Sequence, residues 1–212
     1  MGTALREMLP YAIGLLVSPL PIAAVIVLIG GREGTRKGIV FCVTWWLVSF
    51  VVVLVLALLA GVPVRTPGVA PGWDSAIRII LGLVLLLWAA RHFVEMRRGP
   101  LDSRHSLREL EGIGSLPPDR LTATATRLLL LDPLRLSMLI AAALELGSHQ
   151  LSAIDDLVPA GMFALLGTLT VILPMFAPPS ASWLLRHNDL LVFITSLCFG
   201  AGLLLDGLGQ LQ

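Results

Sequence analysis

The chain has few charged residues and few of the side chains that usually carry chemistry. Only 14% of its 212 residues are Asp, Glu, Lys or Arg, with 2 cysteines and 4 histidines. Cys42 and Cys198 lie within apolar runs and show no metal-ligand spacing. No phosphate-binding glycine loop and no Ser/His/Asp set is visible. We therefore expect no enzyme, no cofactor, no metal site and no nucleic-acid partner. The formal net charge of +1 itself says nothing about nucleic acid, and the distribution of the charges is what matters.

Apolar residues dominate instead, at 56% of the chain and a mean hydropathy of +0.88. The uncharged runs 8–31, 38–64 and 157–185 each exceed the roughly 20 residues that cross about 30 Å of hydrocarbon as a helix. Segments near 75–95, 125–146 and 189–208 contain charges but have the right length. The first run lacks a small-x-small cleavage site, so we expect a retained helix. These patterns predict an all-α integral membrane protein with six transmembrane helices.

Basic residues are distributed unevenly between the loops of this six-helix arrangement. The loops at 31–38, 96–124 and 186–188 share one side and carry Arg32, Arg36, Lys37, Arg97, Arg98, Arg104, Arg108, Arg120 and Arg186. By the positive-inside rule this side is cytoplasmic, so both termini are predicted to be extracytoplasmic in the cell (inner) membrane. Within the longest loop, HSLRELEGIG followed by LPPDR fits either a short amphipathic helix on the inner membrane surface or a solvated linker.

The two halves of the chain share a short motif. Aligning Ser18 with Asp132 matches LLVSPLPIAAVIVL with LLLDPLRLSMLIAA. Because three helices separate the copies, the second copy has the opposite orientation in the membrane, as in inverted-repeat transporters. We therefore predict one membrane domain built as a 3+3 inverted repeat, with halves 1–95 and 125–212 joined by the basic cytoplasmic loop 96–124.

The shared motif predicts breaks in helices 1 and 4. Ser and Asp are favoured helix N-caps, and Pro is favoured at the first helical position. Ser18-Pro19 and Asp132-Pro133 therefore indicate half-helices that begin inside the bilayer, where their unpaired N–H groups attract anions. The alternative is that each proline only kinks its helix.

Asp132 and Arg135 are ionisable residues inside a predicted span, where each costs at least roughly 2.5–3.5 kcal/mol. At i, i+3 they share a helix face and can pair. In one interpretation Arg135 binds an anionic headgroup, and Asp132 is a cap, a counter-charge or a proton carrier. In the other, the two residues form a structural ion pair and Arg135 snorkels to the inner interface. The predicted substrate-binding residues are Ser18, Pro19, Pro21, Asp132, Pro133 and Arg135. Glu145 and Asp206 lie near outer span ends, where we expect exposure to interfacial water.

Three stretches carry a resemblance to a known family: LPYAIGLLVSPLPIAAVIVLIGG, GGREGTRKG and LLLLDPLRLSMLIAAALELG. They resemble the GAP family of small actinobacterial membrane proteins, which includes the peptidoglycolipid-addressing and sulfolipid-addressing proteins of the LysE exporter superfamily. The resemblance implies a 3+3 helix architecture and the export or surface delivery of envelope glycolipids. Members often have Asn-Pro where this chain has Asp132-Pro133, which leaves open whether the charge takes part in the mechanism.

The leading hypothesis is therefore a transporter or transport accessory that moves an anionic or glycosylated envelope lipid outward, with the headgroup held at two half-helix N-termini near the membrane midplane. A second is a proton-coupled exporter of a small solute, such as an amino acid or metal ion, in which Asp132 titrates. A third is a structural partner of a larger lipid-export complex. A thiol redox conduit would need paired cysteines in both halves, which Cys42 and Cys198 do not provide. Energy source and homo-oligomeric state stay open.

Overall fold

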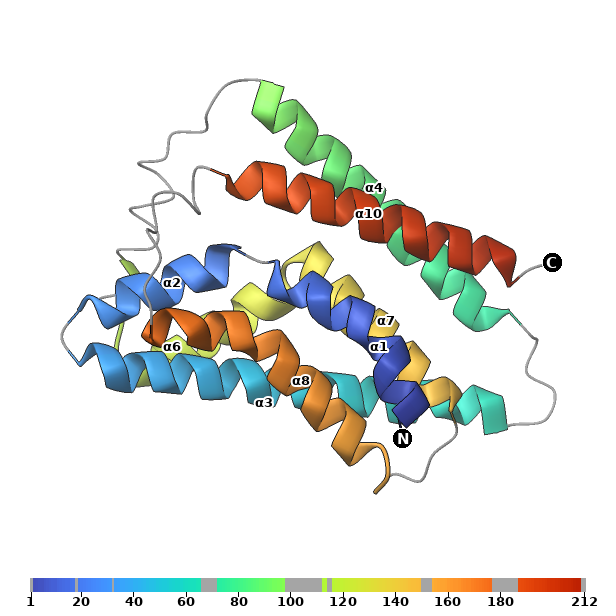
Figure 1. Ribbon diagram of the computed structural model, residues 1–212, viewed down its shortest axis with the longest axis horizontal. Helices are drawn as coiled ribbons and strands as arrows, with labels where there is room; N and C mark the ends of the chain where they lie inside the picture. The colour runs from blue at the N-terminus through green and yellow to red at the C-terminus, as the bar shows by residue number, and fades with distance from the viewer. Residues whose placement is uncertain are drawn as a thin grey trace.

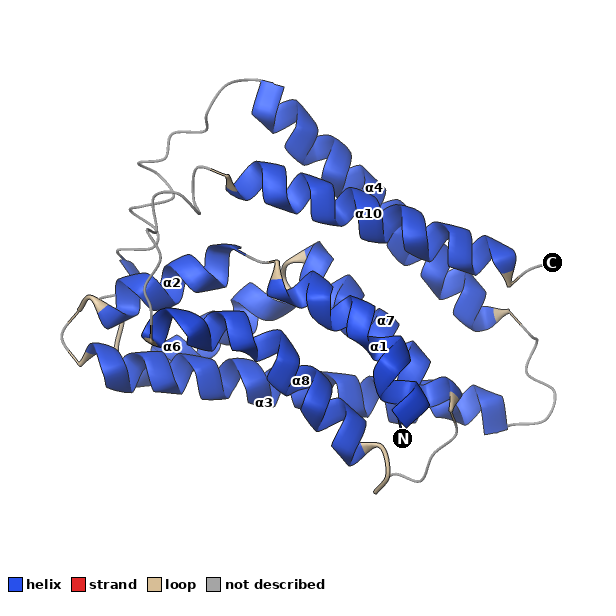
Figure 2. Ribbon diagram, viewed as in Figure 1, coloured by secondary structure: helices blue, strands red, loops and turns tan. Residues whose placement is uncertain are grey.

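The computed structural model of the chain describes residues 2–17, 19–31, 33–65, 72–97, 112–113, 116–149, 154–176 and 187–210. The described residues are helices joined by turns (Figure 2), which confirms the all-α prediction. In chain order the elements are α1 Gly2–Leu16, α2 Pro19–Ile29, α3 Gly34–Arg65, α4 Trp73–Arg97, α6 Pro118–Leu130, α7 Pro133–Ser148, α8 Leu157–Ile172, the 3-10 turn η1 Leu173–Met175, and α10 Asn188–Gly209.

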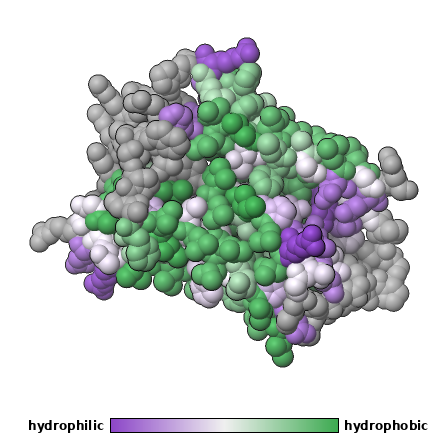
Figure 3. Space-filling view, viewed as in Figure 1, coloured by the Kyte–Doolittle hydropathy of each residue, from purple (hydrophilic) through white to green (hydrophobic). Residues whose placement is uncertain are grey.

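Four helical stretches are long and apolar enough to cross a membrane. They are Gly34–Gly61 of α3, Trp73–Arg97 of α4, Leu157–Met175 of α8 with η1, and Asp189–Gly209 of α10. The α1–α2 pair, bent by 59°, makes a fifth if it counts as one span. Large apolar side chains are exposed along these helices, and Figure 3 shows them covering the middle of one face. The chain is a multi-pass membrane protein.

The expected fourth span is divided in two and does not meet the same criterion. α7 has 16 residues, so at 1.5 Å per residue it is about 24 Å long, shorter than a hydrocarbon core. α6 is amphipathic, since its buried Leu121, Ala125 and Leu129 lie one turn apart on a face opposite exposed Arg120 and Arg127. The predicted segment LPPDR leads into this helix, whereas HSLRELEGIG lies outside the described residues except for 112–113.

Helix α7 lies at the centre of the fold, packed against α1, α3 and α4. Small residues allow the close approach, because a Cβ at Gly147 would lie only 2.8 Å from the carbonyl oxygen of Ala57 on α3. A Cβ at Gly14 on α1 would lie 2.6 Å from the sulfur of Met138 on α7. The charged side chains of α7, Arg135 and Glu145, therefore lie on a helix that is tightly packed against its neighbours.

Helices α4 and α10 form a separate pair. They pack along most of their length, whereas far fewer positions join them to the other helices (Figure 1). We call this unit the α4–α10 pair, the remaining helices the main bundle, and the boundary between them the seam. Within the pair, a Cβ at Gly82 would lie 2.8 Å from the carbonyl oxygen of Gly200, and a Cβ at Gly207 would lie 2.9 Å from that of Ser75.

The glycine contacts of the pair predict a position-specific effect on stability. Gly82→Ala places a methyl group against the α10 backbone, so we expect it to destabilise the protein by about 1–3 kcal/mol, the usual cost of overpacking. Gly202→Ala on α10 is the matched control, because a Cβ there meets nothing within 4 Å. Thermal unfolding in detergent measures both variants. Equal melting temperatures would show that the two helices do not pack as closely as described.

Candidate functional site

The break between α6 and α7 has the local structure that the motif predicts. Asp132 is extended, with φ −86° and ψ 117°, and Pro133 occupies the first turn of α7. The Asp132 Oδ1 atom accepts hydrogen bonds from the backbone N–H groups of Leu134, at 2.9 Å, and Arg135, at 3.5 Å. Asp132 is therefore an N-cap, and the predicted break with a helix starting at this cap is confirmed. Its position inside the bilayer stays a prediction.

Arg135 is buried beside this cap. Its Nη2 atom lies 3.3 Å from Asp132 Oδ2, and its Nη1 donates a hydrogen bond to the carbonyl oxygen of Leu128. Its guanidinium carbon lies 5.5 Å from the ring centroid of Trp45, within cation–π range. The predicted pairing with Asp132 is thus confirmed. The predicted alternative of snorkelling is wrong, because only 3% of the side chain is exposed.

A pocket of about 390 Å³ opens beside this cap, and we call it the Arg127 pocket. It is lined by Leu20, Trp88, Thr124, Arg127, Leu128, Leu131, Asp132 and Arg135. Leu20 belongs to the first turn of α2 and Trp88 to α4, so the pocket lies on the seam. The starts of both half-helices therefore reach one pocket. In Figure 1, α2 and α7 begin near the middle of the long axis and run towards opposite ends.

The remaining predicted site residues contribute differently. Ser18 lies outside the described residues, so its capping role stays a prediction. Pro19 begins α2, and Pro21 is buried within α2. Neither Pro21 nor Pro133 is among the described residues that line the Arg127 pocket. Arg127, Thr124 and Trp88 line the pocket but were not among the predicted site residues, because their position depends on how α4 and α6 pack.

A second charged cluster joins four helices. Arg78 of α4 is buried, and its Nη1 atom lies 2.8 Å from Glu145 Oε1 on α7 and 3.5 Å from Asp206 Oδ2 on α10. The same nitrogen donates a 3.4 Å hydrogen bond to the Tyr11 hydroxyl on α1. The prediction of water exposure is wrong for Glu145, whose side chain is 16% exposed, and holds for Asp206 at 59%. An arginine in an otherwise apolar helix was the sequence signal for this cluster.

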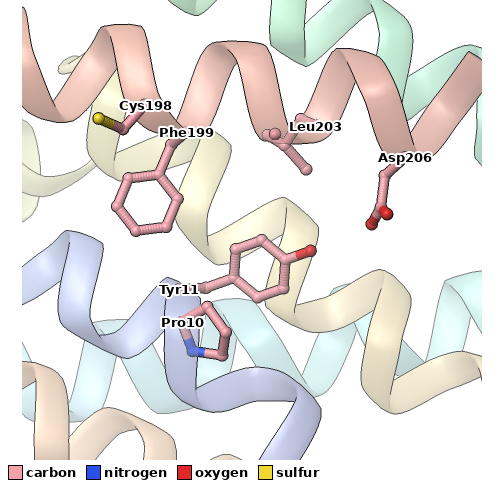
Figure 4. A pocket seen from close by; sticks show the side chains of 7 residues that line it. Pro10, Tyr11, Cys198, Phe199, Leu203 and Asp206 are labelled. Atoms are coloured by element: carbon pink, nitrogen blue, oxygen red, sulfur yellow. The ribbon is translucent and has the colours of Figure 1, made fainter.

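Beside this cluster lies a pocket of about 340 Å³, which we call the Asp206 pocket. It is lined by Pro10, Tyr11, Cys198, Phe199, Gly202, Leu203 and Asp206. Figure 4 shows Pro10 and Tyr11 on α1 facing the α10 residues, with the Tyr11 ring between the two helices. Because α1 is in the main bundle and α10 in the pair, this pocket also lies on the seam.

One further group has the geometry to hold a metal ion. The potential ligand atoms of His92, Glu95 and Asp189 lie within 4.8 Å of one another. Without an ion they already pair, since His92 Nδ1 is 3.5 Å from Glu95 and 3.3 Å from Asp189. Glu95 also accepts a 2.9 Å hydrogen bond from Arg91. These contacts join α4 to α10 within the pair.

The double role of Asp132 predicts different effects for two substitutions. Asp132→Ala removes the cap and leaves the buried charge of Arg135 without its carboxylate, so we expect a loss of about 3–5 kcal/mol. Asp132→Asn keeps an oxygen that caps α7, so we expect the loss to be smaller by about 1 kcal/mol, the value of a typical cap. Chemical or thermal unfolding in detergent compares the two. Equal losses would mean that the cap adds nothing to the ion pair.

Comparison with known proteins agrees with the resemblance in the three quoted stretches. A family model described as Sap, sulfolipid-1-addressing protein, matches residues 8–209. No curated protein and no solved structure matches the chain. The matched residues include both helix breaks, both pockets and all the candidate membrane spans except the first residues of α1. The chain therefore belongs to the family of the sulfolipid-1-addressing protein.

Proposed function

We propose that the chain exports an anionic envelope glycolipid, or assists its export, and that the Arg127 pocket holds the lipid headgroup. The observation that supports this most is the position of two arginines and a helix N-terminus at one pocket on the seam. The family is named for a sulfolipid, and a sulfate is an anion of the kind that arginine side chains and helix N-termini bind.

The pocket has the chemistry for an anion. Arg127 is exposed at its wall, Arg135 lies behind it and Asp132 compensates one of the two positive charges. A guanidinium binds sulfate or phosphate oxygens through two parallel hydrogen bonds. Together Arg127, Arg135 and Asp132 give the pocket one net positive charge, which attracts an anionic headgroup. The negative charge of Asp132 keeps the binding weak enough for release.

The seam gives a lipid a path along which the headgroup meets polar groups and the acyl chains meet apolar ones. Leu20, Leu128 and Leu131 form apolar wall beside the charged groups of the Arg127 pocket. Phe199 and Leu203 do the same in the Asp206 pocket. In this proposal the headgroup moves between the two pockets along the seam, while the acyl chains remain in the membrane hydrocarbon.

The proposal includes the predicted topology of six spans as a 3+3 inverted repeat. Its support is the matching order of elements: a broken segment, α1–α2 or α6–α7, precedes two long helices in each half. The basic side is taken as cytoplasmic. Export then runs from the Arg127 pocket towards the end of the bundle that carries both termini, as Figure 1 orients them.

Arg127 provides the sharpest test, because it is exposed and its loss should leave the fold intact. Cells that lack the gene are complemented with wild type, Arg127→Gln or Arg120→Gln at matched expression. Arg120 is the control, since it is exposed on the same helix but does not line the pocket. Mass spectrometry compares surface-extractable with cell-retained polar lipids. We expect Arg127→Gln to lower delivery of one anionic lipid class about tenfold, the effect of losing one charge-assisted hydrogen bond, with no change for Arg120→Gln.

Two outcomes would contradict the proposal. Normal delivery by Arg127→Gln would remove the Arg127 pocket from the lipid path. An unchanged lipid partition in the deletion strain would reject lipid transport altogether and favour the export of a small solute, which an efflux assay then measures.

A further inference from the structure

We propose that His92, Glu95 and Asp189 form a binding site for one divalent transition metal ion, with Zn²⁺ as the best match. The site lies where the end of α4 meets the start of α10 (Figure 1), so the bound ion joins the two helices of the α4–α10 pair. The proposal goes beyond lipid export, because it needs no lipid. It departs from the absence of a metal site that the sequence predicts, since the third ligand comes from a different helix.

The candidate ligands come from two helix ends. His92 and Glu95 are three positions apart near the end of α4, so they share one face of that helix. Asp189 lies in the first turn of α10. One potential ligand atom from each residue lies within 4.8 Å of the other two. The three side chains therefore converge through the packing of α4 against α10.

The distances match the ligand spacing of a four-coordinate metal ion. Zn²⁺ binds histidine nitrogen and carboxylate oxygen at about 2.0–2.2 Å, and tetrahedral angles then place neighbouring ligand atoms about 3.4 Å apart. His92 Nδ1 lies 3.3 Å from Asp189 Oδ1 and 3.5 Å from Glu95 Oε2. A site with three protein ligands leaves its fourth position to water.

The Nδ1 atom of His92 is the observation that points to an ion. The atom is buried, and it makes no hydrogen bond to any residue that the structure describes, although two carboxylate oxygens lie close to it. A buried polar atom without a hydrogen bond is uncommon and costly. A metal ion between the three ligand atoms satisfies the nitrogen and both carboxylates at once, and it requires no N–H group aligned with either oxygen.

Two neighbouring side chains hold the ligands in position. Arg91 donates a 2.9 Å hydrogen bond to Glu95 Oε1, while Glu95 Oε2 is the oxygen near His92. The Trp88 ring contacts the His92 ring edge-on, with centroids 5.3 Å apart. Partners of this kind orient metal ligands and raise metal affinity. Trp88 also lines the Arg127 pocket, so the bound ion steadies one wall of that pocket.

The donor set selects the class of ion. Imidazole nitrogen binds Zn²⁺ and other first-row transition metals, whereas Ca²⁺ and Mg²⁺ are bound by oxygen ligands. One nitrogen with two carboxylate oxygens therefore favours a transition metal. Among the divalent ions that accept this set, Zn²⁺ binds more tightly than Mn²⁺ or Fe²⁺, and its preferred ligand spacing is the one observed.

Isothermal titration calorimetry tests the site. The full chain is purified without a histidine tag in a neutral detergent, stripped with EDTA and titrated with ZnCl₂ as wild type, Asp189→Asn and Asp119→Asn. Asp119→Asn is the matched control, because Asp119 also lies in the first turn of its helix but is exposed and outside the cluster. We expect one Zn²⁺ per wild-type chain, the same affinity in the control and an affinity at least about a hundredfold lower in Asp189→Asn.

Two further variants separate the ligands from the packing around them. His92→Phe keeps an aromatic ring against Trp88 but removes the nitrogen, so we expect it to lose the Zn²⁺ site as Asp189→Asn does. Arg91→Gln keeps all three ligands and removes the hydrogen bond that orients Glu95, so we expect a loss of affinity of about tenfold. Melting temperatures in EDTA show which variants are folded before the titration.

Three outcomes would overturn the proposal. Wild type without Zn²⁺ binding, or folded ligand variants that bind Zn²⁺ as wild type does, would remove the site. Tighter binding of Ca²⁺ than of Zn²⁺ would overturn the assigned ion class. If neither ligand variant folds, wild type decides alone: ZnCl₂ must raise its melting temperature more than CaCl₂ does at the same concentration, and EDTA must reverse the shift. No lipid substrate is present, so this failure is distinguishable from a failure of lipid delivery.

Discussion

The structure around the Arg127 pocket depends on satisfying backbone groups where a helix stops inside an apolar bundle. Pro133 cannot donate a hydrogen bond to α6, so carbonyl groups at the end of α6 and N–H groups at the start of α7 lose their helical partners. Arg135 donates to the carbonyl of Leu128, and Asp132 accepts from the N–H groups of Leu134 and Arg135. The ion pair between these two side chains then compensates both charges. Removing either residue therefore disturbs backbone and charge together.

The same requirement explains why charged groups gather at the seam. The main bundle is held by close contacts of small residues on α1, α3 and α7, and the α4–α10 pair by glycine contacts of its own. Arg135 finds its carboxylate and aromatic partners within the main bundle. Between the two units the packing is less extensive, and there Arg78 finds Glu145 across the seam. The boundary between two well-packed units thus becomes the part of the molecule that can hold a polar ligand.

Local features of the sequence were sufficient to predict the break, the cap and the Asp132–Arg135 pair, because all three depend on residues within one turn of each other. The second cluster was not predictable in this way. Arg78, Glu145 and Asp206 come from three helices, and Arg78 is 67 residues from Glu145 and 128 from Asp206 in the chain, so each looked like an isolated charge near a span end. The division of the predicted fourth span was missed for a related reason: protein rather than lipid surrounds most of α7, which relaxes the length that a spanning helix needs.

The two ends of the seam have opposite charge balances, and this difference bears on the proposed lipid path. The Arg127 pocket has two arginines and one aspartate, whereas the second cluster has one arginine and two carboxylates. An anionic headgroup moving from the first to the second leaves an attractive site and approaches a repulsive one. In the proposed export path, the Arg127 pocket is therefore the end of the seam that binds the anion, and the second cluster is the end that does not hold it.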